Sequence, residues 1–194
     1  MRIISGTAGG IPLKVPEAVT RPTTDKVRQA LFSSLGEAVP GARVLDLFAG
    51  SGALGLECLS RGAVSAVFVE SHRGACEVIK ANMAKARLHG GRVHCGDALR
   101  VVGELARVQP GSFDLIFADP PYAHRPGDKN WALELLQSEA LRGLLAPGGS
   151  FLLECRVTTA ELSPSWNWDV VRDREYGETR LLWLKQHSDG LSNS

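Results

Sequence analysis

Short apolar runs alternate with helical patterns from Arg43 onward, and this alternation predicts an α/β fold. Nearly every position in the runs is apolar, which is typical of parallel strands that are covered on both faces. The runs that we expect to form strands are Arg43–Phe48, Ala66–Glu70, Arg92–Cys95, Phe113–Ala118 and Ser150–Cys155. Because such strands alternate with helices in right-handed βαβ units, the pattern favours an open, doubly wound sheet.

Between the strands, apolar side chains recur at the spacing of an amphipathic helix. The stretches concerned are Gly52–Arg61, Arg73–Ala86 and Trp131–Leu141. The first of them is expected to end at Gly62, because glycine commonly follows the last helical turn.

The N-terminal segment departs from this alternation and is predicted to form a hairpin followed by a helix. Arg2–Ile4 and Ile11–Val15 would pair around Gly9-Gly10. Thr23 or Thr24 would then cap a helix, since both residue types accept hydrogen bonds from the first turn. The apolar face of that helix consists of Val27, Leu31 and Leu35, and Gly36 ends it.

The C-terminal segment also has its own pattern. Trp168–Tyr176 and Thr179–Leu184 flank Gly177-Glu178, which predicts an antiparallel hairpin. The polar residues after it are typical of a disordered tail. We therefore expect an N-terminal extension over residues 1–40, a main domain over residues 41–186 and a tail over residues 187–194.

The composition is that of an ordinary globular protein. The chain has 194 residues, 44% of them hydrophobic and 22% charged, which fits one compact domain. No apolar run reaches the roughly 20 residues needed to cross a bilayer, and the N-terminus lacks the apolar core of a secretion signal. We therefore expect a cytoplasmic protein with no membrane partner. We also expect it to be a monomer.

The cysteines Cys58, Cys76, Cys95 and Cys155 are far apart in the sequence. They form no Cys-x-x-Cys pair, and no histidine stands near them at a metal-ligand interval. We expect buried, reduced thiols and no metal site.

The net charge is +1, so the chain as a whole lacks the strongly basic balance of many nucleic-acid-binding proteins. The charges are unevenly placed, however, because residues 1–28 contain five Lys or Arg but only two Asp or Glu. A basic segment on a near-neutral body suits local contact with phosphates. A merely solvated face would account for the same charges.

A glycine-rich turn after the first strand is the first candidate for ligand binding. Gly50-Ser51-Gly52-Ala53-Leu54-Gly55 has the spacing of a dinucleotide fingerprint, which would favour a nicotinamide cofactor. Asp46 changes this interpretation, because a carboxylate just before the glycines repels a pyrophosphate and attracts an ammonium. S-adenosylmethionine carries an ammonium and a sulfonium but no phosphate. The sequence therefore predicts S-adenosylmethionine as the cofactor.

Acidic residues also follow the next two strands. Glu70 could accept hydrogen bonds from both ribose hydroxyls, and Asp97 could accept one from the adenine amine. Asp97 could also be an ordinary N-cap of a helix that begins at Ala98. Ligands of open α/β sheets bind at the carboxyl ends of the strands, so these residues would line one cleft. The expected cofactor contacts are Asp46, Phe48, Ala49, Gly50, Gly52, Glu70, Asp97, Ala98 and Asp119.

The fourth strand leads into Asp119-Pro120-Pro121-Tyr122, whose prolines fix the backbone. An exocyclic amine on an aromatic ring is a poor nucleophile, because its lone pair is delocalised into the ring. If the Asp119 carboxylate and the Pro120 carbonyl each accept one N–H, the lone pair can point at a methyl donor. Tyr122 offers a ring face on which a planar base can stack. The motif therefore predicts N-methylation of a flat amine.

His124 lies in a polar loop, Ala123–Asn130, directly after this motif. We expect the loop to fold over the substrate rather than to supply a catalytic base, since transfer to an amine needs no tuned base.

With both motifs in place, the chain resembles the bacterial family that methylates the exocyclic N2 amine of guanine in small-subunit ribosomal RNA. The resemblance covers most of residues 2–184 and is most specific in Arg21–Phe32 and Asp46–Glu57. Leu59–Ala63, Asp119–Tyr122 and Tyr176–Thr179 match too. It implies a Rossmann-like class I methyltransferase fold with a seven-stranded, mostly parallel sheet, a C-terminal antiparallel hairpin and an RNA-contacting N-terminal extension.

The resemblance further implies S-adenosylmethionine as cofactor and small-subunit (16S) ribosomal RNA, within an assembling subunit, as partner. By matching position, Arg21, Thr23, Thr24 and Arg28 would face the cofactor or the RNA, and Tyr122 would face the target base. The chain departs from the pattern at Gly6–Pro12, which lacks the arginines that many relatives carry there.

Three other functions use some of the same features. An N-methyltransferase that acts on DNA adenine or on a protein glutamine amide would need a similar proline-rich motif. A nicotinamide-dependent oxidoreductase would explain the glycines but not Asp119–Tyr122. A non-catalytic RNA-binding factor could retain the fold without turnover.

Overall fold

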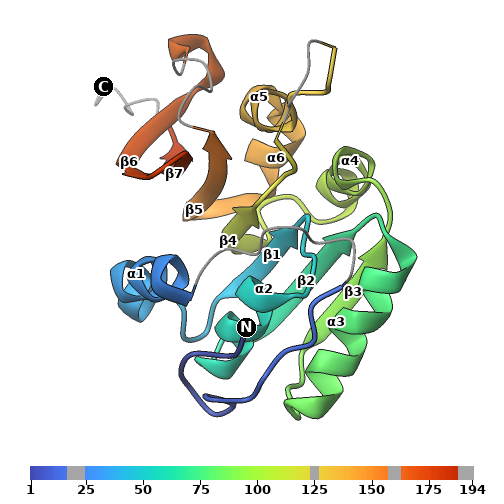
Figure 1. Ribbon diagram of the computed structural model, residues 1–194. Coiled ribbons are helices and arrows are strands. Elements are labelled where there is room, and N and C mark those ends of the chain that lie inside the picture. The colour runs from blue at the N-terminus through green and yellow to red at the C-terminus, as the bar shows by residue number, and fades with distance from the viewer. Residues whose placement is uncertain (17–24, 123–126, 157–162, 188–194) are drawn as a thin grey trace.

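The computed structural model describes residues 1–16, 25–122, 127–156 and 163–187, and within them it contains a seven-stranded sheet (Figure 1). The strands, in spatial order, are β3 (Gly91–Cys95), β2 (Ser65–Glu70), β1 (Arg43–Leu47), β4 (Phe113–Ala118), β5 (Leu145–Arg156), β7 (Thr179–Gln186) and β6 (Trp168–Tyr176). The first five strands run parallel to one another, whereas β7 is antiparallel to both of its neighbours, β5 and β6. The predicted mostly parallel sheet and its C-terminal hairpin are confirmed.

Helices cover both faces of this sheet. One layer consists of α1 (Asp25–Leu35), α2 (Ala53–Ser60) and α3 (Arg73–Lys85), and the other of α4 (Ala98–Val108), α5 (Trp131–Gln137) and α6 (Glu139–Leu144). Short 3₁₀ turns span Gly36–Ala38 and Pro164–Trp166.

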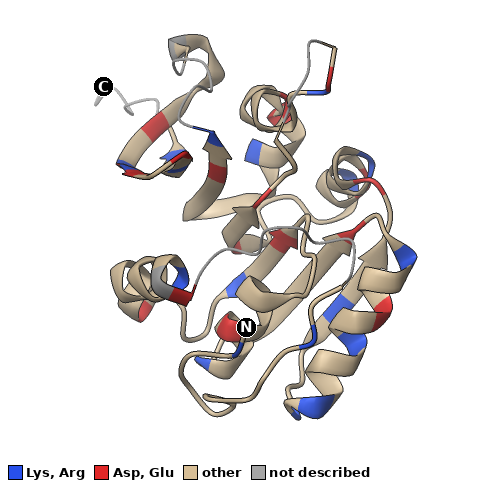
Figure 2. Cartoon of the chain, in the orientation of Figure 1, with Lys and Arg blue, Asp and Glu red and all other residues tan. Residues whose placement is uncertain are grey.

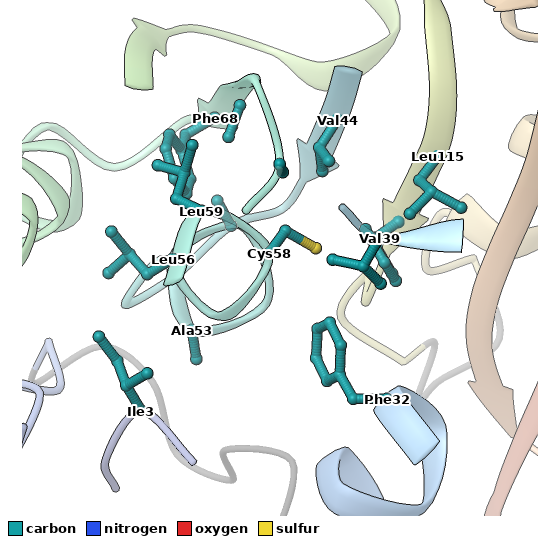
Figure 3. Packing of buried hydrophobic residues seen from close by; sticks show 14 of the residues in the cluster. Ile3, Phe32, Val39, Val44, Ala53, Leu56, Cys58, Leu59, Phe68 and Leu115 are labelled. Atoms are coloured by element: carbon teal, nitrogen blue, oxygen red, sulfur yellow. The ribbon is translucent and has the colours of Figure 1, made fainter. Parts of the chain in front are cut away.

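Successive residues of the central strands serve opposite layers. Val44 and Leu115 are buried in the core under α1–α3, whereas Leu45 and Ile116 are buried in the core under α4–α6. Figure 3 shows the first of these cores, in which Phe32 of α1 lies close to the side chains of α2. Since both faces are covered, the strands are apolar at nearly every position, and this is why they could be recognised in the sequence.

The expected helix over Trp131–Leu141 is wrong in its extent, because two short helices replace it. The break falls at Ser138, whose backbone is extended and whose hydroxyl oxygen accepts a hydrogen bond from Leu141 N over 3.1 Å. Ser138 therefore caps α6, a position that serine favours over a helix interior. The apolar spacing continues across the break, which is why periodicity alone missed it.

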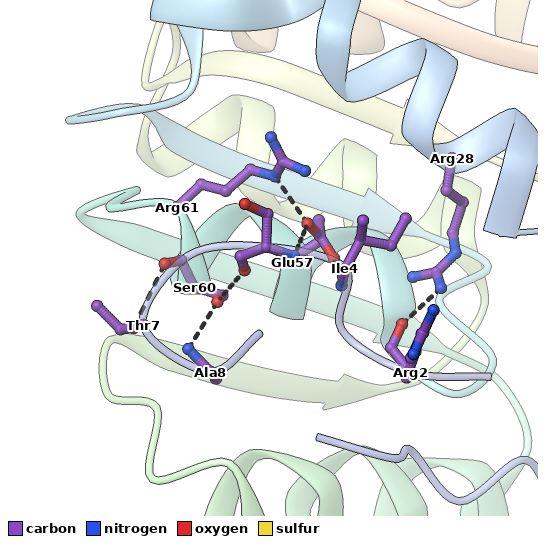
Figure 4. Close-up of polar contacts among 9 residues, drawn as sticks. Arg2, Ile4, Thr7, Ala8, Arg28, Glu57, Ser60 and Arg61 are labelled. Carbon is purple, nitrogen blue, oxygen red and sulfur yellow. Dashed lines mark hydrogen bonds and ion pairs between the residues drawn. The ribbon is translucent and has the colours of Figure 1, made fainter. Parts of the chain in front are cut away.

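The expected N-terminal hairpin is also only partly correct. The described residues there form a single antiparallel bridge, between Arg2 and Pro12, in place of two paired strands. Backbone hydrogen bonds from Ile3 N to Ile11 O and from Gly10 N to Ile3 O, at 3.0 and 2.8 Å, still join the two arms. The backbone between them is also bound to α2. The buried Glu57 carboxylate accepts hydrogen bonds from Ile4 N and Ser5 N at 2.6 and 3.0 Å (Figure 4).

Two further side chains fasten this N-terminal segment to the helices. Ser60 Oγ accepts a hydrogen bond from Ala8 N over 2.9 Å (Figure 4). Asn82 of α3 accepts from Lys14 N and donates to the carbonyl oxygens of Lys14 and Ser51. The segment thus forms part of the main core, and Asn82 connects it to the glycine-rich turn.

His187, the first residue of the expected tail, is bonded to the start of β6 and the residue before it. His187 N donates to the carbonyl oxygen of Asn167 at 3.0 Å, and its ring nitrogen lies 2.6 Å from an Asp169 oxygen. The other residues of that stretch, 188–194, lie outside the described residues. Within the described parts of the chain, no helix is long and apolar enough to cross a membrane.

Candidate active site

The acidic residues singled out in the sequence lie at one edge of the sheet. They stand at the carboxyl ends of β1 and β2 and directly after β3 and β4, which are neighbours in the order β3-β2-β1-β4. Figure 2 shows acidic positions in red at this end of the sheet. The strand order reverses between β1 and β4, and open α/β sheets bind their ligands at such a reversal.

The glycine-rich turn connects β1 to α2 through three left-handed residues. Phe48, Gly50 and Gly52 have φ angles of 56°, 54° and 78°. Such angles are uncommon for a residue with a side chain, so Phe48 is held by its surroundings. Gly55 serves packing: a Cβ there would lie 2.4 Å from Cε1 of Phe68, so only glycine lets α2 approach β2 this closely.

The Asp46 carboxyl is almost fully buried, at 2% exposure, directly below this turn. Its Oδ2 accepts a hydrogen bond from Gly55 N over 2.9 Å, which ties β1 to the start of α2. The pKa of Asp46 is raised to about 8, mainly by burial; the Gly55 hydrogen bond opposes this rise, and the nearby charges of Asp119 and Glu70 contribute to it. The charges of Asp119 and Glu70 therefore interact electrostatically with Asp46 at this edge of the sheet.

Glu70 and Asp97 are each engaged with the backbone. The Glu70 carboxylate accepts hydrogen bonds from Gly50 N at 2.9 Å and from His72 N at 2.8 Å, so it holds the glycine-rich turn in place. Asp97 caps α4 by accepting from Arg100 N over 3.0 Å, which confirms the N-cap interpretation. Their contacts with a cofactor stay predictions.

Tyr122 is fixed from two distant strands. Its hydroxyl lies 3.0 Å from Thr179 Oγ1 at the start of β7 and donates to Glu154 Oε1 of β5 over 3.4 Å. The Arg156 guanidinium lies 5.6 Å from the centre of the ring, in cation–π range. Burial raises the pKa of Tyr122 to about 12, so the hydroxyl stays protonated at neutral pH.

The sequence reasoning gave no role to Glu154, Arg156 or Thr179. Thr179 was included in the matching segment Tyr176–Thr179, and its contact with Tyr122 gives that match a physical reason. Glu154 and Arg156 lie in a strand that was recognised only by its apolar residues, so no local signal could assign them to the site.

An aromatic pair joins the glycine-rich turn to the segment after Tyr122. Phe48 and Trp131 meet edge to face with their ring centroids 5.3 Å apart. Lys129 Nζ lies 3.9 Å from the centroid of the Trp131 ring, in cation–π range. Trp131 is therefore a further residue that sequence reasoning missed, and it supports the unusual backbone of Phe48.

The predicted RNA-facing segment is only partly visible. Arg21, Thr23 and Thr24 lie outside the described residues, as does His124. Arg28 is completely buried and donates to the Arg2 carbonyl at 2.6 Å (Figure 4). It also donates to Asp25 Oδ1 at 2.8 Å. Its described role is thus to hold α1 against the N-terminal segment, and contact with cofactor or RNA stays a prediction.

The cysteines differ partly from expectation. Cys58, Cys76 and Cys155 are buried, free thiols as predicted, but Cys95 is exposed at the end of the edge strand β3. The described residues contain no cluster of three or more His, Cys, Asp or Glu side chains able to hold a metal ion.

The strand order β3-β2-β1-β4-β5-β7-β6, with an acid below a glycine-rich turn at the reversal, defines a class I methyltransferase fold. The family model "Conserved hypothetical protein 95" matches residues 1–185. The chain is 32% identical to the ribosomal RNA small subunit methyltransferase D of Escherichia coli K12, covering 100% of this chain and 94% of the relative. It is 30% identical to the protein of the same name from Haemophilus influenzae, covering 91% and 89% of the two chains.

A solved structure agrees with these relatives. The structure of a hypothetical protein from Thermus thermophilus superposes with a TM-score of 0.78 at 33% identity, covering 95% of this chain and 99% of that one. The chain therefore belongs to the conserved hypothetical protein 95 family, which confirms the family resemblance seen in its sequence.

Proposed function

We propose that this chain transfers the methyl group of S-adenosylmethionine to the exocyclic N2 amine of a guanine in small-subunit ribosomal RNA. Its family makes it a ribosomal RNA methyltransferase. The guanine N2 acceptor is the finer part of the proposal and comes from the resemblance together with the Asp119–Tyr122 motif.

The observation that carries the proposal is the acidic character of this edge of the sheet. Asp46, Glu70 and Asp119 act on one another at the end of the sheet, and the charges of the latter two raise the pKa of Asp46. Such a site repels a dinucleotide pyrophosphate and suits a ligand with an ammonium and a sulfonium. S-adenosylmethionine fits this chemistry: Asp46 would hold its ammonium, Glu70 its ribose and Asp97 its adenine amine.

The acceptor would be held by Asp119 and Pro120. When bound, the cofactor supplies an electrophilic methyl group at the end of β1 and β4. The Asp119 carboxylate and the Pro120 carbonyl each accept one N–H of the amine, so that the nitrogen lone pair points along the transfer axis. Positive charge develops on the nitrogen during transfer, and these two acceptors stabilise it. Asp119 or water then takes the released proton.

Tyr122 would position the base. Its hydroxyl is anchored to Thr179, and Arg156 lies over its ring, so the ring has a fixed orientation against which guanine can stack. A guanine paired within RNA must leave its partner to reach this ring, or be unpaired already. We further propose that the enzyme acts in the cytoplasm, as a monomer without a metal, on RNA of an assembling subunit.

The proposal is tested by supplying labelled S-adenosylmethionine with unmodified small-subunit RNA, naked and assembled into subunits. Label should enter the RNA with the wild-type protein and be lost with Asp119→Ala, while calorimetry finds cofactor binding largely kept. Transfer to DNA or to a protein glutamine, with none to RNA, would favour the corresponding alternative. Undiminished transfer by Asp119→Ala would overturn the mechanism.

A further inference from the structure

A shallow groove lies between α1 and the β6–β7 hairpin, which are neighbours in Figure 1. Leu31 and Ser34 of α1 form one side, and Arg172, Arg174 and Tyr176 of β6 form the other, with Trp183 of β7 between them. The enclosed volume is only about 50 Å³, far below that of a pocket for a small-molecule ligand. A partner of this groove would therefore lie along it.

The two faces of the hairpin differ in charge. Side chains of a strand alternate between faces, so Arg172, Arg174 and Tyr176 share the groove face. Asp173 lies on the opposite face, where it forms an ion pair with Arg180 at 2.6 Å. The residues that line the groove include two arginines and no acid. The groove is thus a local positive strip on a chain whose net charge is only +1.

The groove contains two guanidinium groups and two aromatic rings. The Arg174 side chain lines the groove and is exposed. Arg172 donates to Ser34 Oγ over 2.8 Å with its guanidinium 5.7 Å from the Trp183 ring. Guanidinium groups beside an aromatic ring suit the phosphates and the base faces of a nucleic acid.

The groove is continuous with the candidate active site. Tyr176, at its end, pairs in the hairpin with Thr179, and the Thr179 hydroxyl lies 3.0 Å from that of Tyr122. Tyr176 is 38% exposed, so its ring is available for stacking. A strand of nucleotides that placed one base against Tyr122 could therefore continue past Tyr176 toward Arg174 and Arg172.

We propose that this groove binds the single-stranded RNA that flanks the target guanine, and this inference rests on the proposed function. Arg174 and Arg172 contact successive phosphates, while Tyr176 stacks on a neighbouring base. Arginine guanidinium and aromatic faces together are the chemistry that recognises single-stranded nucleic acid, and the groove offers both without a competing acid.

The test measures how the protein binds a fluorescently labelled single-stranded RNA that contains unmodified guanine, as a function of salt. Arg174→Ala should weaken binding roughly threefold or more and reduce the salt slope by about 0.7, the value for one phosphate contact on a single strand. In the double variant that also carries Arg172→Ala, the salt slope should fall by about twice that amount. Arg174→Lys should keep the wild-type salt slope, because the positive charge remains.

Arg107→Ala is the matched control, since Arg107 is exposed in the last turn of α4 and the charge change is equal. In methylation assays Arg174→Ala should raise the KM for RNA and leave kcat unchanged. If the salt slope of Arg174→Ala equals that of Arg107→Ala, the groove does not bind RNA and the proposal is wrong. Weaker binding to assembled subunits, with unchanged binding to the RNA, would also overturn it in favour of a protein partner.

The two proposals fail separately in this design. If the wild-type protein binds RNA through Arg174 but transfers no methyl group, the groove stands and the proposed function is wrong. If methyl transfer to guanine occurs while Arg174→Ala leaves affinity and salt slope unchanged, the function stands and the groove is wrong.

Discussion

The carboxyl edge of the sheet consists of two halves that are built in different ways. In the cofactor half, at the ends of β1–β3, the key acids bind backbone N–H groups close by in sequence: Asp46 binds Gly55, and Asp97 binds Arg100. In the acceptor half, at the ends of β4, β5 and β7, Tyr122 is held by Glu154 and Thr179, 32 and 57 residues away.

The cofactor half is thus built from contacts between residues close in sequence, whereas the acceptor half depends on contacts that form only in the complete fold. A strand, a turn and a helix start position the cofactor half by themselves, whereas the acceptor half requires the C-terminal hairpin to dock beside β5. Substitutions in the first half should therefore alter cofactor affinity, and those in the second should alter methyl transfer.

Asp119→Ala should give the largest effect. It should also distinguish the two halves most clearly, because it should lower kcat much more than cofactor affinity. Loss of one of the two acceptors for the amine should reduce kcat by about 10²–10³, which is typical for removal of a preorganised polar contact to developing charge. Single-turnover assays measure the reduction, and calorimetry should find cofactor binding largely kept, because Asp46 and Glu70 remain. A parallel loss of cofactor affinity would mean that the two halves are not separable.

The pH dependence of cofactor binding tests the cofactor half alone. With a pKa of about 8, Asp46 is protonated at neutral pH in the ligand-free protein. A ligand ammonium prefers the carboxylate, so binding should release this proton and weaken about tenfold per pH unit below 8. Calorimetry in buffers of different ionisation enthalpy measures both quantities. A wild-type affinity that does not change with pH would contradict this role.

The same raised pKa also predicts the sign of a stability change. Between the ordinary carboxyl value of 3.8 and about 8, the folded state holds a proton that the unfolded state has lost. The free energy of unfolding should therefore fall as the pH rises through this window. Asp46→Asn should flatten the profile in urea titrations.

Gly55→Ala should disturb the cofactor half structurally. The new Cβ would lie 2.4 Å from the Phe68 ring, so α2 must shift from β2 at a cost of about 1–3 kcal/mol in the free energy of unfolding. Gly103→Ala in α4 is the control, because nothing lies within 4 Å of its added Cβ. The control should gain roughly 0.5–1 kcal/mol in denaturant titrations. Equal effects at the two glycines would refute the packing argument.

Thr179→Val should give the smallest effect and affect only the acceptor half. It removes the hydroxyl that lies 3.0 Å from Tyr122, so the ring loses one anchor and kcat should fall by about three- to tenfold. Thr179→Ser keeps the hydroxyl and should restore the rate. A change in cofactor affinity with unchanged kcat would place Thr179 in the other half.

The same division explains what could be predicted from the sequence. Asp46, Gly50 and Glu70 follow recognisable strands at fixed intervals, so their common location follows from the rules of parallel sheets. The anchors of Tyr122 carry no local pattern, since they depend on how β7 inserts between β5 and β6. The break at Ser138 and the attachment of residues 4–8 to α2 also depend on single polar contacts that periodicity does not register.

The chemical identity of the methylated nucleoside tests the central claim most directly. Small-subunit RNA is incubated with the protein and labelled S-adenosylmethionine, digested to nucleosides and analysed by mass spectrometry. The account predicts that the label is recovered as N2-methylguanosine. Label in a methylated adenosine, or in a guanosine methylated at another atom, would contradict it.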